Sequence, residues 1–282
     1  MLYPSKTHRA ARLIPALLAA VLFLNVGCVF AAFQDSTYRF KEDFSKTVSL
    51  KAGDRFSLEN VNGGVSVATW KDNKVEIKAV KTARKDEADL KEVEIQVQEG
   101  AGSVSVKAVW PKFPRRADVS VEFEIKVPEG VILDEVETVN GGVGITGHYQ
   151  RINVGTTNGS ITVEDATGEL EAGTTNGGIR VDRFQGRVAA STTNGNIKLE
   201  GLSFKDGLSA ETTNGSITLA VSSPETLNAD LSARTTNGSV TVDFPITLQN
   251  LKGSKKHIEG KIGQGGSPIE LETTNGSIRL TK

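Results

Sequence analysis

Cysteine is almost absent from this 282-residue chain, and Cys28 is the only one. The chain therefore cannot form an intrachain disulfide or a thiolate cluster for zinc or iron. Histidine is also scarce: only His148 and His257 lie beyond the first segment, and neither stands at a metal-ligand spacing. We expect both to be structural or solvent exposed, and we expect neither a metal ion nor another cofactor.

The sequence also has no excess of basic residues. Its 33 Lys and Arg residues nearly balance 34 Asp and Glu residues, and residues 32–282 alone carry 30 basic and 34 acidic side chains, a formal net charge of −4. Proteins that bind nucleic acid usually present a clustered basic face. Nucleic acid is therefore not an expected partner.

The longest apolar run, Leu13–Val26, is shorter than the roughly 20 apolar residues of a membrane-spanning helix. It follows the cations Lys6, Arg9 and Arg12, and this layout is typical of an export signal. We therefore expect residues 1–31 to be a signal peptide and the folded part to lie in the periplasm, in the cell envelope or on the cell surface.

Two ways of processing this signal remain open. Residues 29–31, Val-Phe-Ala, suit an ordinary signal peptidase, whereas Val-Gly-Cys at 26–28 resembles the end of a bacterial lipobox with Asn25 in place of the usual leucine. In the second case the signal ends before Cys28, and a lipid on Cys28 attaches the protein to a membrane. An uncleaved anchor is a third alternative.

One nine-residue phrase recurs along the chain. GTTNGSITV at 155–163 returns as GTTNGGIRV, STTNGNIKL, ETTNGSITL, RTTNGSVTV and ETTNGSIRL, with asparagines at 158, 176, 194, 214, 237 and 275. The spacings are 18, 18, 20, 23 and 38 residues, typical of a repeat array with loop insertions. Looser copies, VNGGV, stand at 61–65 and 139–143. We assign 37–138 to an N-terminal β-strand region and 139–282 to the repeats, in one domain.

Apolar residues alternate within each repeat, as in Ile161 and Val163. A period of two predicts strands, and Asn-Gly predicts a tight turn with positive φ between them. Longer strands are expected at 74–80, 103–110 and 118–127, and a helical turn only at Lys85–Leu90. The stretch Phe244–Leu271, which delays the last repeat, is predicted to be a cap or a side loop.

Two all-β arrangements fit an 18-residue, two-strand repeat. In a parallel β-solenoid, or β-helix, each repeat is one coil, and identical positions stack about 4.8 Å apart, so that Asn lies over Asn and Thr over Thr. In an antiparallel β-meander, equivalent strands lie two strands apart. The near-identity of Thr-Thr-Asn-Gly across six copies favours the solenoid, preceded by longer strands.

Three features together carry a family resemblance: the tail GKIGQGGSPIELETTNGSIRL, the strand ending FEIKVPEGV, and the serial TTNGSI phrases. The chain resembles the bacterial "putative adhesin" family of exported β-solenoid domains over roughly residues 38–282. The resemblance implies a solenoid of the envelope or cell surface. It implies no catalytic residues.

Two groups of residues are candidates for function. The segment Val109–Arg116 interleaves aromatic and cationic residues, a combination suited to a sugar, an anionic lipid or a cell-wall polymer; its candidate contacts are Trp110, Phe113, Arg115 and Arg116. The alternative is a hairpin connection with Trp110 in the core. A column of carboxylates at 18-residue spacing comprises Glu164, Asp182 and Glu200.

The carboxylate column could hold calcium or act on a glycan. The simpler interpretation is that Arg180 and Lys198 screen these side chains across coils. We therefore expect a non-enzymatic exported solenoid that contacts an envelope component, a surface glycan or a protein. A glycan-active lyase or hydrolase is the alternative, and a purely structural envelope accessory is a third hypothesis.

Overall fold

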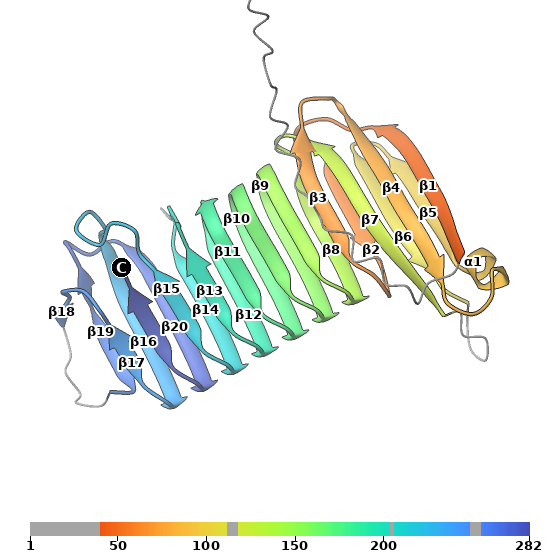
Figure 1. Ribbon diagram of the computed structural model, residues 1–282. Coiled ribbons are helices and arrows are strands. Elements are labelled where there is room, and N and C mark those ends of the chain that lie inside the picture. Colours follow the sequence, from red (N-terminus) through yellow and green to blue (C-terminus); the bar gives the residue numbers. More distant parts are fainter. Residues whose placement is uncertain (1–39, 112–117, 204–205, 249–254) are drawn as a thin grey trace, which may run out of the picture. The chain divides into compact units, whose positions relative to one another are not determined.

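The computed structural model describes residues 40–111, 118–203, 206–248 and 255–282 (Figure 1). These residues lie within one compact unit. Its 21 strands form one continuous hydrogen-bonded sheet, accompanied by one short helix, α1 (Ala88–Glu92). The all-β prediction is confirmed. Helix α1 begins three residues later than the helical turn that was predicted at Lys85–Leu90. No helix in these ranges has the length and apolarity to cross a membrane.

The sheet is wound into two faces because two long strands, β9 (Val143–Asn158) and β10 (Ile161–Asn176), each contribute their first half to one face and their second half to the other. Face A runs, in spatial order, through β1 (Phe40–Ser49), β4 (Lys74–Ala83), β7 (Val119–Pro128), β3 (Val65–Trp70), β9, β10, β11 (Ile179–Gln185), β13 (Ile197–Glu200), β15 (Ile217–Ala220), β21 (Ile278–Thr281) and β17 (Val240–Val242).

Face B lies opposite. In spatial order it runs through β5 (Glu94–Gly100), β6 (Ser103–Val109), β2 (Arg55–Glu59), β8 (Ile132–Asn140), β9, β10, β12 (Val188–Asn194), β14 (Leu208–Asn214), β20 (Ser267–Asn275), β16 (Ala229–Asn237), β19 (His257–Ile262) and β18 (Thr247–Leu248).

Successive repeats pair in parallel and in register, so that Asn158 lies beside Asn176 and Asn176 beside Asn194. One coil thus comprises one strand of each face, and the coils stack along a single axis (Figure 1). This arrangement confirms the parallel β-solenoid, and the antiparallel meander is wrong. Antiparallel pairs occur at the two ends of the stack, where β1, β4 and β5 precede the coils and β18 and β19 follow them.

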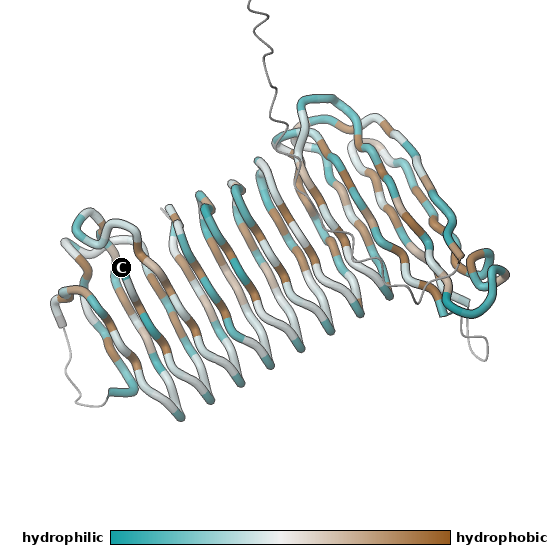
Figure 2. Tube along the Cα trace, viewed as in Figure 1, coloured by the Kyte–Doolittle hydropathy of each residue, from teal (hydrophilic) through white to brown (hydrophobic). Residues whose placement is uncertain are grey.

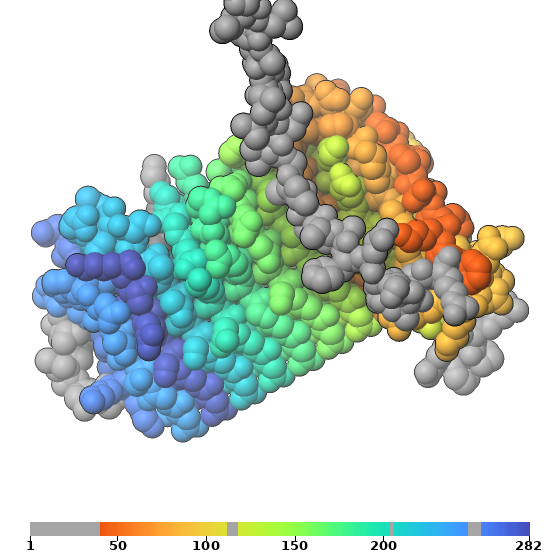
Figure 3. All heavy atoms as spheres, viewed as in Figure 1, coloured from red at the N-terminus to blue at the C-terminus, as the bar shows by residue number. Residues whose placement is uncertain are grey.

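The stacking order differs from the chain order at both ends. The coil β2–β3 lies between the coils β6–β7 and β8–β9, and the last coil, β20–β21, lies between β14–β15 and β16–β17. In Figures 1 and 3 the dark blue C-terminal strands accordingly lie inside the stack, beside lighter blue ones. The 38-residue spacing before Asn275 therefore contains β18 and β19, which cover the outer side of β16 as the predicted cap.

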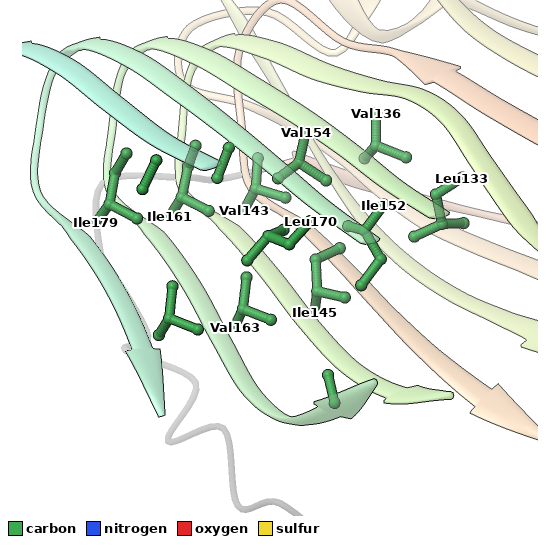
Figure 4. Packing of buried hydrophobic residues seen from close by; sticks show 14 of the residues in the cluster. Leu133, Val136, Val143, Ile145, Ile152, Val154, Ile161, Val163, Leu170 and Ile179 are labelled. Carbon is green, nitrogen blue, oxygen red and sulfur yellow. The ribbon is translucent and has the colours of Figure 1, made fainter. Parts of the chain in front are cut away.

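The core lies between the two faces. Inward side chains at every second position, such as Ile161, Val163 and Leu170, are at most 1% exposed, and Figure 4 shows them stacked with their equivalents from neighbouring coils. Along the tube in Figure 2, apolar and polar residues alternate accordingly. The period of two in the sequence therefore marks one row of buried residues on each face.

The predicted reason for glycine in the repeated phrase is wrong. Gly159, Gly177 and Gly195 are not among the residues with positive φ. Instead, a Cβ added to Gly177 would lie 1.9 Å from the carbonyl oxygen of Gly159 in the preceding coil. Positive φ occurs at the opposite corner of the coil, at Asp165 (48°) and Arg183 (50°). Glycine is thus required at the Asn-Gly corner because neighbouring coils approach so closely.

Candidate functional site

The predicted contact segment Val109–Arg116 is only partly described. Trp110 is half-buried against the core, and its Nε1 is buried without a hydrogen-bond partner among the described residues. Phe113, Arg115 and Arg116 lie outside the described residues, as does Cys28. The position of Trp110 fits the alternative of a side chain that packs into the core, and the contact role of the other three residues stays a prediction.

The predicted carboxylate column exists. Glu164, Asp182 and Glu200 are paired in register on three adjacent strands of face A. The guanidinium of Arg180 reaches all three, at 3.6 Å from Glu164, 3.1 Å from Asp182 and 3.0 Å from Glu200. Lys198 adds a contact of 2.8 Å to Glu200. The column is therefore neutralised across coils, as the simpler interpretation expects.

No group of three or more His, Cys, Asp and Glu side chains that could hold a metal ion occurs in the described parts of the chain. The two histidines have local partners: His148 Nδ1 lies 3.1 Å from Thr167 Oγ1, and His257 Nε2 lies 2.9 Å from Glu259. The first contact joins the neighbouring strands β9 and β10, and the second lies within β19. They bring the two histidines to no common site.

The Asn-Gly corner carries two hydrogen-bonded ladders. In the first ladder, each asparagine after the first donates its side-chain Nδ2 to the Oδ1 of the preceding asparagine in the stack, at 2.8 to 2.9 Å. In stacking order this ladder comprises Asn62, Asn140, Asn158, Asn176, Asn194, Asn214, Asn275 and Asn237. The first threonine of each phrase is buried and donates its hydroxyl to a glycine carbonyl of the neighbouring coil. The corner is thus architectural.

An open recess of about 640 Å³ lies on the outer surface of face B. It crosses the strands β6, β2, β8, β9, β10, β12 and β14, and so runs along the axis of the stack. Its floor contains small residues where other coils have long ones, namely Gly155, Gly173, Ala189, Ser191 and Ser209. We call it the face B recess.

Carboxylates surround this floor. Glu59, Glu137, Glu171 and Glu211 line the face B recess, and Lys107 is the one basic residue among the described residues that line it. Lys107 is paired with Glu59. Partial burial, together with the nearby carboxylates of Glu135 and Glu59, raises the pKa of Glu137. The recess is therefore acidic.

The sequence itself carries a sign of this recess. The third residue before each ladder asparagine lies in one column across face B. In stacking order the column reads Glu59, Glu137, Gly155, Gly173, Ser191, Glu211, Glu272 and Arg234. Small residues between two glutamates at equivalent positions predict a depression with acidic ends. The depression becomes visible once the coils are placed in register.

A second aromatic residue, Trp70 at the end of β3, was not predicted to matter. The Nζ atoms of Lys74 and Lys126 lie 5.4 and 5.8 Å from the centroid of its ring, and its Nε1 donates to the carbonyl of Lys74. Cations at such distances are attracted to the ring face. The ring is therefore engaged with cations of its own chain.

The comparisons with known proteins agree with this architecture. The family model of the Toastrack DUF4097 domain matches residues 32–281. No curated protein matches the chain. A crystal structure of a "putative adhesin" from Bacteroides fragilis has a TM-score of 0.50 at 14% identity over 85% of this chain and 97% of that one. A "putative cell adhesion protein" from Clostridium sporogenes has a TM-score of 0.37 at 13% identity, over 86% and 99%.

At 14% identity the Bacteroides fragilis structure bears on the fold alone. The family model spans nearly the whole chain, including every described strand of both faces. The chain belongs to the Toastrack DUF4097 family.

Proposed function

We propose that this protein is an exported, non-enzymatic, adhesin-like protein that holds a component of the cell envelope or cell surface in the face B recess. The observation that carries the proposal is the recess itself, an acidic depression of about 640 Å³ on an otherwise regular surface. Concave sites with a few convergent polar groups are the usual places for ligands. The name "putative adhesin" of the Bacteroides fragilis structure supports the same class of function.

A binding role fits the chemistry better than catalysis. General acid and base catalysis of glycan cleavage needs two carboxyl groups that are free to exchange protons. Glu164, Asp182 and Glu200 instead share the guanidinium of Arg180. The strands beneath the recess are paired on both sides, so the recess has a rigid floor that displays side chains at fixed spacing.

Export and membrane attachment belong to this proposal through the sequence of residues 1–31. A lipid on Cys28 would attach the protein to a membrane, whereas cleavage after Ala31 would release it. Mass spectrometry of the mature N-terminus separates the two: a lipid-modified Cys28 supports attachment, and a mature chain that begins beyond Ala31 excludes it.

The recess can be filled without disturbing the coils. A Cβ at Gly173 would lie 3.6 Å from its nearest neighbour, Ser191 Oγ, and the backbone there has no positive φ, so Gly173→Tyr places a large side chain on the floor. Gly144 on face A offers a matched control, since a Cβ there meets nothing within 4 Å. We expect Gly173→Tyr to lose retention on the purified envelope fraction of the source cell, and Gly144→Tyr to keep it.

Equal retention of the two tyrosine variants would show that the recess is not the contact surface. A separate variant with alanine at Trp110, Phe113, Arg115 and Arg116 tests the predicted contact segment in the same assay. Loss of retention there, with an unchanged melting temperature, would move the contact surface to residues 109–116. Unchanged retention removes that segment from the proposal.

A further inference from the structure

We infer that Asn237 is a site of slow covalent modification, at which the backbone nitrogen of Gly238 displaces the side-chain amide and leaves aspartate or isoaspartate. Asn237 lies at the outer end of the asparagine ladder, at the corner of the coil β16–β17. This coil is the last of the described stack, beyond β20–β21. The inference goes beyond the proposed function, because Asn237 is not among the residues of the face B recess.

The reaction needs only water and the two residues themselves. The glycine nitrogen gives its proton to water and attacks Cγ of the asparagine, and the new C–N bond closes a succinimide ring. The bond between Cγ and Nδ2 breaks, and Nδ2 takes up a proton and leaves as ammonia. Water then opens the ring at Cγ to give aspartate, or at the main-chain carbonyl carbon to give isoaspartate. Glycine favours the attack because it has no side chain to hinder the approach.

A hydrogen bond on the glycine amide opposes this reaction, because the amide proton must leave before the nitrogen can attack. In seven of the eight corners, the glycine after the ladder asparagine donates its N–H to the main-chain carbonyl of the next asparagine in the stack, at 2.8 to 3.1 Å. These glycines are Gly63, Gly141, Gly159, Gly177, Gly195, Gly215 and Gly276. The eighth, Gly238, donates to no acceptor within the described ranges.

The cap passes this corner without covering the amide of Gly238. The carbonyl of Lys256 accepts the N–H of Thr235 at 2.8 Å. The carbonyl of Lys255 accepts the N–H of Val240 at 2.7 Å. The cap thus pairs one amide on each side of the Asn-Gly sequence, whereas Gly238 between them is exposed. Water can therefore take the proton of this amide.

The side chain of Asn237 is also held by fewer bonds than those inside the ladder. Inner members such as Asn275 make two ladder bonds, one with each neighbouring asparagine. Asn237 makes only the bond to Asn275. Asn62 at the opposite end also makes a single ladder bond, but the amide of Gly63 is hydrogen bonded. Among the described ladder residues, Asn237 alone combines one ladder bond with an unbonded glycine amide.

The modification weakens the outermost coil. A carboxylate in place of the amide cannot donate to Oδ1 of Asn275, so the end of the ladder loses this bond. Isoaspartate also adds a methylene group to the backbone between β16 and β17, which shifts Val240 against its partner Ile278. The protein is therefore expected to lose order with age from the capped end of the stack.

The local sequence provides matched controls. Asn158, Asn214 and Asn275 stand in the same Thr-Thr-Asn-Gly-Ser sequence as Asn237. A difference in rate among these four asparagines in the folded protein therefore reports their hydrogen bonds. Asn237 lacks two of the bonds that the others have, and two bonds of ordinary net strength correspond to a rate ratio of roughly thirtyfold.

The test is incubation of the folded protein at neutral pH in water labelled with heavy oxygen, followed by digestion in ordinary water and mass spectrometry. Only an asparagine that reacts during the incubation gains the label. We expect Asn237 to gain it about thirtyfold faster than Asn158, Asn214 and Asn275. In denaturant the four should react at similar rates. Hydrogen exchange gives a second measurement, in which the amide of Gly238 should exchange faster than that of Gly276.

Equal rates at the four asparagines of the folded protein would overturn the inference, and so would slow exchange of the Gly238 amide. The variant Asn237→Ala separates the two causes, because it removes one ladder bond of Asn275 but leaves the Gly276 amide bonded to the main-chain carbonyl of residue 237. Asn275 should then still react more slowly than Asn237 does in the unchanged protein. A rate as fast as that of Asn237 would show that the free amide is not the cause.

Discussion

The two threonines of each repeated phrase should differ in their contribution to stability. Thr212 is 1% exposed, and its hydroxyl donates to the carbonyl of Gly195 at 3.0 Å, an oxygen with no other donor among the described residues. Replacement of Thr212 by valine nearly preserves the shape but leaves this carbonyl buried and unpaired. Such a loss costs about 1–3 kcal/mol, which corresponds to a melting temperature roughly 4–8 °C lower for a loss of about 2 kcal/mol.

The next residue supplies the control. Thr213 is exposed on face B, so Thr213→Val should change the free energy of unfolding by less than about 0.5 kcal/mol. Denaturant unfolding followed by far-ultraviolet circular dichroism measures both variants. If Thr212→Val and Thr213→Val unfold at the same denaturant concentration, the buried hydroxyl ladder does not stabilise the stack, and the reasoning is refuted.

Three further predictions concern the corner and the recess. Gly177→Ala should lower the free energy of unfolding by about 1–3 kcal/mol or more, because the new Cβ would overlap the preceding coil. Gly173→Ala should be tolerated. Similar denaturation midpoints for the two variants would contradict the close approach of neighbouring coils at Gly177. Asn275→Ala removes two ladder hydrogen bonds, whereas Asn237→Ala removes one. At about 0.5–1 kcal/mol for each hydrogen bond, the Asn275 variant should unfold at the lower denaturant concentration. If the Asn237 variant unfolds first, Asn275 does not lie between two neighbouring asparagines of the ladder. The raised pKa of Glu137 means that the folded state binds a proton more tightly than the unfolded state does. Stability is therefore lost as pH rises from the ordinary carboxyl pKa through the raised one. Glu137→Gln should raise the denaturation midpoint at pH 7.5 and leave it nearly unchanged at pH 4, and an equal change at both pH values would exclude this cause.

The sequence predicted the repeat, the strands and the stacking because these depend on short patterns. The alternation of Ile161 and Val163 specifies one buried row, and the identity of Asn158, Asn176 and Asn194 indicates a ladder. The order of the coils could not be predicted in the same way. The spacing before Asn275 reveals an insertion, but it does not tell on which side of β16 the last coil stacks.

The candidate site was harder to predict for a related reason. Glu137, Gly173 and Glu211 are far apart in sequence, and each looks ordinary within its own repeat. They form one recess only because parallel pairing places them in a single column. The regular spacing of charged residues in the sequence favoured Glu164, Asp182 and Glu200 instead. Arg180 neutralises these three carboxylates, and the spacing of residues in the sequence does not give the side-chain geometry on which this depends.

The insertion of β20 and β21 between two earlier coils has a consequence for how the chain reaches its final state. The edges of β14 and β15 that face them stay unpaired until residues 267–281 have been made, and so do those of β16 and β17. Unpaired strand edges invite aggregation and proteolysis. A chain truncated before the last coil therefore exposes unpaired strand edges on both faces, at β14, β15, β16 and β17. Only a chain that contains β20 and β21 can pair these edges and complete the stack.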